Sequence, residues 1–93
     1  MENKIRAHAI ITGRVQGVFF RVETQRAARS HSVNGWVRNK MDGSVEAVLE
    51  GEEADVKGTL AWCQKGPPHA RVRKVDVTWQ KYTGEFELFE VTY

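Results

Sequence analysis

Apolar residues recur along this chain with two different periods. Alternation at every second position is typical of a strand, and recurrence at every third or fourth position is typical of an amphipathic helix. The pattern predicts, in order along the chain, a strand at 5–12, a helix at 20–31, strands at 35–39 and 44–50, a helix at 52–65, a strand at 70–79 and a short last strand at 89–93. This β-α-β-β-α-β order with a short final strand predicts an α+β fold of the ferredoxin-like, split βαβ type, with two helices packed on one face of an antiparallel sheet.

Glycine and proline mark the ends of these elements. Asp42-Gly43 is a strong hairpin signal between the two strands that follow the first helix. Gly66-Pro67-Pro68 ends the second helix. The two halves of the strand at 70–79 alternate out of phase, and an extra residue near Arg73-Lys74 would reconcile them. Such an extra residue is the pattern of a β-bulge.

Composition narrows the class of protein. A length of 93 residues fits one domain over residues 1–93, and a net charge of +2 is too small to argue for nucleic acid or an anionic membrane as a partner. No stretch reaches the roughly 18 apolar residues of a membrane span, and the first residues lack the pattern of a secretory signal. Cys63 is the only cysteine, so no internal disulfide is expected. We therefore expect a small cytoplasmic protein that is a monomer.

The stretch from Gly13 to Arg21 carries the candidate chemistry. Gly13 and Gly17 allow the main chain to turn its N–H groups inward, and the stretch leads into the first predicted helix. The first N–H groups of a helix have no acceptor within it, and the helix dipole favours a negative charge there. Arg21 adds a planar cation suited to phosphate or carboxylate. The residues therefore predict an anion cradle, although a glycine-bounded turn before a helix is more often structural only.

Two motifs in the chain resemble those of the acylphosphatase family. The first, G-x-V-Q-G-V-x-F-R, runs from Gly13 to Arg21, and the second, G-x-V-x-N-x-x-D-G-x-V-E, runs from Gly35 to Glu46. A weaker patch, Gly66-Pro67 followed by residues 70–72, is also similar. The likeness covers essentially the whole chain, and the two main motifs together are highly specific.

The resemblance implies a metal-free hydrolase that cleaves the carboxyl–phosphate bond of acyl phosphates by direct attack of water. By motif position, the phosphate-binding loop consists of Gln16, Gly17, Val18, Phe19, Phe20 and Arg21. The catalytic residues are then Arg21, which binds the phosphate with the loop amides, and Asn39, which positions the water. The implied partner is a small-molecule acyl phosphate, and no cofactor or metal is expected. Nothing in the motifs reads the acyl part of the substrate.

One segment departs from the family pattern. Where the family usually has Leu-Gly-Leu at the end of the first helix, this chain has His31-Ser32-Val33. The substitution removes the glycine that is best suited to a left-handed helix end. We expect an effect on the local packing and on the helix end, and none on the site.

Other functions fit the sequence less well. RNA-recognition domains share the element order but carry stacking aromatic residues on their central strands, and residues 44–50 contain none. His8, His31 and His69 are scattered without metal-ligand spacing, and Cys63 lies on the apolar face of the second helix. The alternative that stays open is a non-catalytic module of the same fold that binds phosphate or carbamoyl phosphate.

Overall fold

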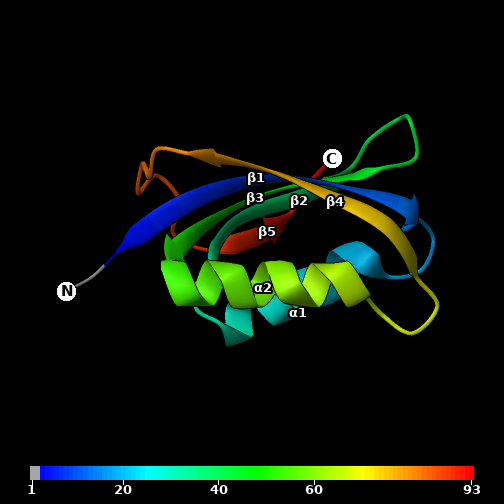
Figure 1. Ribbon diagram of the computed structural model, residues 1–93, viewed down its shortest axis with the longest axis horizontal. Coiled ribbons are helices and arrows are strands. Elements are labelled where there is room, and N and C mark those ends of the chain that lie inside the picture. The colour runs from blue at the N-terminus through cyan, green and yellow to red at the C-terminus, as the bar shows by residue number, and fades with distance from the viewer. Residues whose placement is uncertain (1–2) are drawn as a thin grey trace.

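Two helices lie side by side on one face of a five-stranded sheet, as the computed structural model shows for residues 3–93 (Figure 1). The elements are β1 (Lys4–Arg14), α1 (Phe20–Ser30), β2 (Asn34–Asn39), β3 (Val45–Glu52), α2 (Glu53–Lys65), β4 (Arg71–Gln80) and β5 (Phe89–Val91). The fold class and the order of elements predicted from the sequence are confirmed. None of the helices within residues 3–93 has the length and apolar character needed to cross a membrane.

The sheet has the strand order β4-β1-β3-β2-β5 and corrects the prediction at one edge. The pairs β1–β4, β1–β3 and β2–β3 are antiparallel, but β5 pairs with β2 in parallel, so the sheet is mixed and not purely antiparallel. The reason lies in the connection. The last residue of β4 lies at the end of the sheet where β2 begins, and residues 81–88 cross along this end from one edge of the sheet to the other. The chain therefore enters β5 beside the start of β2 and runs in the same direction.

The predicted β-bulge is confirmed. Thr12 pairs with Lys74 and Gly13 pairs with Val72, so Arg73 is the extra residue on β4. Gly13 has a φ of 125°, and a Cβ atom there would lie 2.1 Å from the carbonyl oxygen of Arg71. Only glycine fits this close approach of two strands.

The core lies between the sheet and the helices because alternate strand residues face the same side. From the sheet, Ala7, Ala9, Ile11, Val37, Val45, Ala47 and Leu49 are buried. From α2, Val56, Thr59, Leu60 and Cys63 are buried. Burial raises the pKa of the Cys63 thiol to about 12, so this side chain is a packing residue.

The end of α1 keeps the geometry of a glycine-terminated helix without the glycine. Ser32 takes a φ of 58°, the N–H of Val33 donates to Ala28 O at 2.8 Å, and the N–H of Ser32 donates to Arg29 O at 3.1 Å. These two bonds form a Schellman motif in which Ser32 carries the strained conformation. His31 packs over Gly58 of α2, where a Cβ atom would lie 2.9 Å from the imidazole ring. The helix end therefore keeps its geometry at His31-Ser32, with Ser32 in the left-handed conformation.

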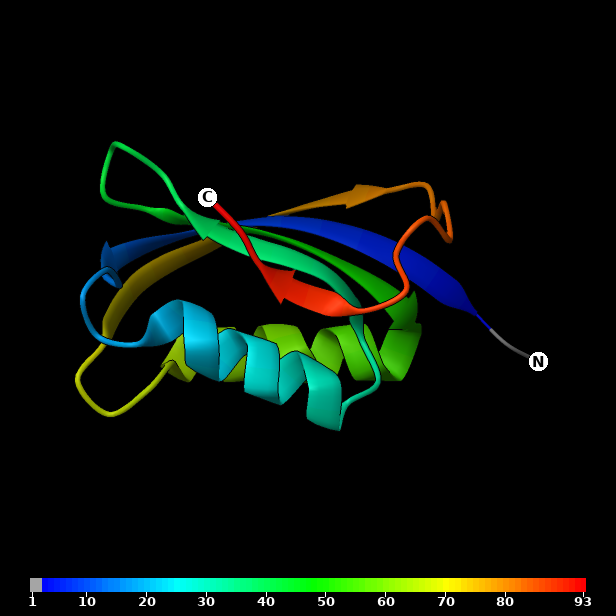
Figure 2. The ribbon, with the colours of Figure 1, turned by 180° about the vertical axis from the view of Figure 1, so that it is seen from behind.

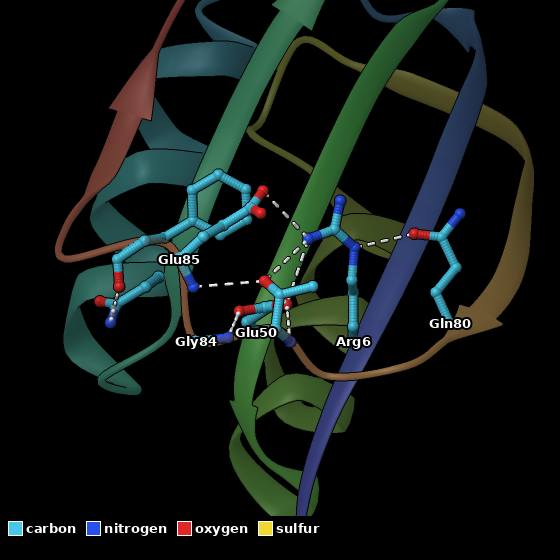
Figure 3. A network of polar contacts seen from close by, with 8 residues as sticks. Arg6, Glu50, Gln80, Gly84 and Glu85 are labelled. Atoms are coloured by element: carbon cyan, nitrogen blue, oxygen red, sulfur yellow. Dashed lines mark hydrogen bonds and ion pairs between the residues drawn. The ribbon is translucent and has the colours of Figure 1, made fainter.

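The two ends of the sheet differ in what covers them. Three connections, residues 15–19, 40–44 and 66–70, lie at one end, which we call the open end (Figure 2). At the opposite, closed end, Glu50 is only 2% exposed. Its carboxylate accepts hydrogen bonds from Arg6, from Thr83 and from the N–H of Gly84 (Figure 3). Residues 81–88 are thus fixed across the closed end by a carboxylate of β3.

Candidate functional site

The connection between β1 and α1 folds so that its backbone turns twice. Gly17 has a φ of 74° and Phe19 a φ of 65°, which is a left-handed conformation that a bulky residue rarely adopts. The side chains on either side hold the turn in place, because Val15, Val18 and Phe20 are buried in the core, and Phe20 packs on Trp62 with ring centroids 5.6 Å apart. Phe19, by contrast, is 76% exposed.

The turn leads directly into the start of α1, which has no side-chain cap among residues 3–93. Phe19 is the N-cap residue of α1, and no side chain of residues 3–93 forms a capping hydrogen bond there. The first intrahelical bond runs from the N–H of Glu23 to Phe19 O at 3.1 Å. The preceding N–H groups therefore keep their hydrogens directed out of the helix, where its dipole favours a negative charge.

Arg21 lies in this first turn. Its side chain is half-buried, and it forms no ion pair with any other residue in the described part of the chain. Its guanidinium carbon lies 5.8 Å from the centre of the Tyr93 ring, which is a cation–π contact. The positive charge of Arg21 is therefore held beside the helix start, and no acidic side chain among residues 3–93 pairs with it.

Asn39 approaches the start of α1 from the sheet and lies at the same hollow as Arg21. It is the last residue of β2, and its buried Oδ1 atom has no hydrogen-bond partner in the part of the chain that the structure describes. Buried polar atoms are nearly always satisfied, so an orphaned amide oxygen calls for an explanation. A hollow of about 220 Å³ is lined by Gly17, Phe19, Phe20, Arg21 and Asn39, together with Val15 and Val22. We call this hollow the cradle.

Gln16 holds the two parts of the cradle together. Its Nε2 atom donates to Lys40 O at 2.7 Å and to Ser44 O at 2.9 Å, the two carbonyls that frame the β2–β3 turn. Gln16 and Val18 belong to the predicted binding loop, but their side chains do not line the cradle. What these two residues can offer a ligand is their backbone. The side chain of Gln16 instead ties the loop to the hairpin that carries Asn39.

The β2–β3 turn has the predicted Asp42-Gly43 chemistry. Asp42 Oδ1 accepts from the hydroxyl of Ser44 at 2.6 Å and from its N–H at 2.9 Å, and Gly43 takes a φ of 95°. The Ser44 hydroxyl and N–H lower the pKa of Asp42, so the carboxylate stays ionised at neutral pH. The turn fixes the register Asn39–Val45, and thereby the direction from which Asn39 approaches the cradle.

Other candidate sites are weaker. Among residues 3–93, no three His, Cys, Asp or Glu side chains come close enough together to hold a metal ion. A larger hollow of about 590 Å³ lies near Trp36, Phe86 and Tyr93, but it includes neither Arg21 nor Asn39. The cradle is the hollow that combines Arg21 with Asn39, whose Oδ1 has no hydrogen-bond partner among the described residues.

Sequence reasoning missed three features of the site. The motif indicated the loop, but nothing marked Phe19 as the left-handed residue, because no glycine stands there. The anchoring bonds of Gln16 depend on contacts 24 and 28 residues away along the chain. The contact of Arg21 with Tyr93 joins residues 72 positions apart along the chain (93 minus 21). Only the alternation at the C-terminus, which predicted a strand up to residue 93, hinted that Tyr93 would be placed by β5.

Known proteins are similar to this chain in sequence and in structure. The sequence profile of the acylphosphatase family matches residues 7–91. The acylphosphatase of Roseiflexus sp. (strain RS-1) is 52% identical over 93 residues, which is 100% of both chains. The acylphosphatase of Pelotomaculum thermopropionicum is 47% identical over 91 residues, covering 98% of this chain and 99% of that protein.

A solved structure is similar as well. The crystal structure of acylphosphatase from Bacillus subtilis superposes with a TM-score of 0.92 at 32% sequence identity, covering 96% of this chain and 99% of that chain. With the family profile matched over most of the sequence, the chain belongs to the acylphosphatase family.

Proposed function

We propose that the protein is an acylphosphatase, an enzyme that hydrolyses the carboxyl–phosphate bond of acyl phosphates to a carboxylate and inorganic phosphate. The observation that carries the proposal is that Arg21 and Asn39 line one hollow at an uncapped helix start, and that Asn39 Oδ1 has no hydrogen-bond partner within residues 3–93. The family membership of the chain supports the same activity.

The phosphate group of the substrate binds in the cradle. The backbone N–H groups of residues 16–21 surround its oxygens, and the guanidinium of Arg21 adds two donors and a positive charge. Phosphoryl transfer passes through a loose transition state, so charge stabilisation and positioning supply most of the catalysis. Donors that are already fixed before the substrate arrives are most effective in this task. Here, the buried side chains of Val15, Val18 and Phe20 fix the loop.

Asn39 positions the attacking water. Its amide can accept a hydrogen bond from the water through Oδ1 and does not titrate, whereas a carboxylate at this position would repel the phosphate. The water oxygen attacks phosphorus, the bond from phosphorus to the acyl oxygen breaks, and its electron pair leaves with the carboxylate. A carboxylate whose conjugate acid has a pKa near roughly 4 departs without protonation, so no general acid is needed. The proton of the water passes to a phosphate oxygen of the substrate.

The remaining expectations belong to the same proposal. The protein acts as a single acylphosphatase-like domain over residues 1–93, as a monomer in the cytoplasm, on a small-molecule acyl phosphate and without a nucleic-acid partner. The alternative of a non-catalytic phosphate-binding or carbamoyl-phosphate-binding module is not favoured, since the relatives that match over the whole chain are named acylphosphatases.

The test is hydrolysis of acetyl phosphate and benzoyl phosphate by the purified protein, with and without EDTA. We expect release of inorganic phosphate at the same rate in both conditions, with competitive inhibition by added phosphate. Absence of hydrolysis would contradict the proposed activity, and loss of hydrolysis in EDTA would contradict the metal-free mechanism.

A further inference from the structure

A second hollow adjoins the cradle. It has a volume of about 430 Å³ and lies between the β1–α1 connection and the connection from α2 to β4. The two hollows share Gly17 and Phe19, whereas Arg21 and Asn39 line only the cradle. A Cβ atom at Gly17 would meet nothing within 4 Å, so the passage beside this residue is open.

Two arginines face each other at the second hollow. Arg14 and Arg71 are register partners at the last paired position of β1 and β4, both are exposed, and both line the hollow. The bulge at Arg73 sets this register. Like charges directly opposite each other on neighbouring strands destabilise a sheet. Within residues 3–93, neither arginine has an acidic partner to offset the repulsion.

The reaction geometry points the acyl group toward this hollow. In a displacement at phosphorus, the attacking and leaving oxygens stand roughly in line on opposite sides. A water at Asn39 therefore directs the leaving acyl group away from Asn39. The second hollow adjoins the cradle and lacks Asn39, and its volume suffices for a small acyl group.

We propose that the second hollow is the acyl subsite and that Arg14 and Arg71 make the enzyme prefer acyl phosphates whose acyl group carries a second negative charge. His69 lines the same hollow and adds a donor. The inference rests on the proposed function, because it concerns the other half of the same substrate. Exposed ion pairs are modest in strength, so two of them are expected to give about a three- to tenfold preference.

The experiment compares two acyl phosphates of equal shape. In 4-carboxybenzoyl phosphate the ring carries a carboxylate, and in 4-carbamoylbenzoyl phosphate it carries a neutral amide of the same size. We expect kcat/KM at low salt to favour the carboxylate by about three- to tenfold in the unmodified protein. We call the kcat/KM for the carboxylate compound divided by that for the amide compound the ratio. The single variants Arg14→Gln and Arg71→Gln should reduce this ratio, and the double variant should bring it to about one or below.

Arg73→Gln is the matched control. It removes the same charge two positions from Arg71, but Arg73, the bulge residue, does not line the hollow. The ratio in this variant should stay at the unmodified value. A ratio of one in the unmodified protein, or an equal fall of the ratio in Arg73→Gln and Arg71→Gln, would overturn the acyl subsite while leaving the proposed hydrolase intact. Failure to hydrolyse either compound, and acetyl phosphate as well, would overturn the proposed function and the subsite with it.

Discussion

The closed and open ends of the sheet use an arginine in opposite ways. At the closed end, Arg6 donates to Glu50 at 3.1 Å and to Gln80 at 2.8 Å, and Glu50 also fixes Thr83 (Figure 3). At the open end, Arg21 has no acidic partner in the described chain, and Asn39 keeps a buried oxygen without a donor.

The difference separates a structural use of polar residues from a functional one. A network whose members satisfy one another rigidifies the fold, and removing one member costs stability. Polar groups that the protein fixes but leaves unsatisfied lower the stability of the folded state while the site is empty. A ligand that forms hydrogen bonds with them offsets this cost when it binds. We therefore expect changes at the closed end to appear in unfolding experiments and changes at the open end to appear in kinetics.

The largest effect is expected for Arg21→Gln. Loss of one fixed donor to a transition-state oxyanion typically costs roughly 10²–10³ in turnover, or about 3–4 kcal/mol. We expect kcat/KM for acetyl phosphate to fall by about this factor and inhibition by inorganic phosphate to be nearly lost. The free energy of unfolding should fall by no more than about 1 kcal/mol, since within residues 3–93 Arg21 has no ion pair to lose, only its cation–π contact with Tyr93. An Arg21→Gln protein that keeps its activity but loses stability would contradict the functional use of this arginine and indicate a structural one.

The next effect is expected for Glu50→Gln at the closed end. The amide keeps an acceptor but loses the ion pair with Arg6, so unfolding in urea should show a loss of about 1–3 kcal/mol. The kcat/KM for acetyl phosphate should be unchanged, because residues 81–88 do not line the cradle. A large loss of activity at full stability would show that the two ends are coupled.

The same carboxylate predicts a dependence on pH. Burial would raise the pKa of Glu50, but the donors of Thr83, Arg6 and Gly84 outweigh it and hold the pKa below its usual value of 4.5. A lowered pKa stabilises the folded state above the unfolded-state pKa, and this stabilisation is lost as the pH falls through the folded-state value. The stability difference between the unmodified protein and Glu50→Gln should thus be constant from neutral pH to about pH 5 and shrink below 4.5.

A smaller effect is expected when a substitution places a carboxylate side chain at the open end. Val22 is 46% exposed, lies in the first turn of α1 and lines the cradle. In Val22→Glu, the carboxylate can accept from the free N–H groups and repel a phosphate, so the inhibition constant for phosphate should rise by about tenfold. Val22→Gln is the neutral control of the same size and should bind phosphate more tightly than Val22→Glu. Equal inhibition constants in the two variants would argue against an electrostatic cradle.

The smallest effects concern strain, since each end holds one non-glycine residue with positive φ, Ser32 at the closed end and Phe19 at the open end. Ser32→Gly should stabilise the protein by about 0.5–1 kcal/mol with no change in kcat, as the left-handed conformation is then unstrained. Phe19→Gly relieves similar strain but frees the loop, so kcat/KM should fall several-fold. Thermal unfolding and steady-state kinetics of both variants check this pair. A Phe19→Gly protein with the kcat/KM of the unmodified protein would mean that the fixed conformation at Phe19 has no role in the site.

The sequence predicted the layers of the fold and the residues of the motifs, because both depend on local information. Periodicity located every helix and strand, and the phase shift at Arg73-Lys74 predicted the bulge. The direction of β5 was not predicted, because three residues of strand carry no signal for their partner. The positive φ of Phe19 had no signal either, because no glycine stands there, whereas the missing glycine of the family pattern at His31-Ser32-Val33 pointed to a left-handed residue at this helix end.

Within the site, the sequence predicted residues that the structure brings to the cradle, but not how they are held. Arg21 and Asn39 were predicted from their motif positions, and the structure places both at the cradle. The bonds of Gln16 to Lys40 and Ser44, which join the loop to the hairpin, arise only when the chain folds. The pairing of Arg14 with Arg71 likewise depends on the register that the bulge creates.

The most direct test of the account is the variant Asn39→Ala, because it separates binding from turnover at the open end. We expect kcat for acetyl phosphate to fall by about 10²–10³-fold while the inhibition constant for phosphate changes by less than about threefold. Thermal unfolding should show a folded protein of at least normal stability, since the orphaned Oδ1 is removed. A folded Asn39→Ala protein with the kcat of the unmodified enzyme would contradict the role of Asn39 in positioning the water.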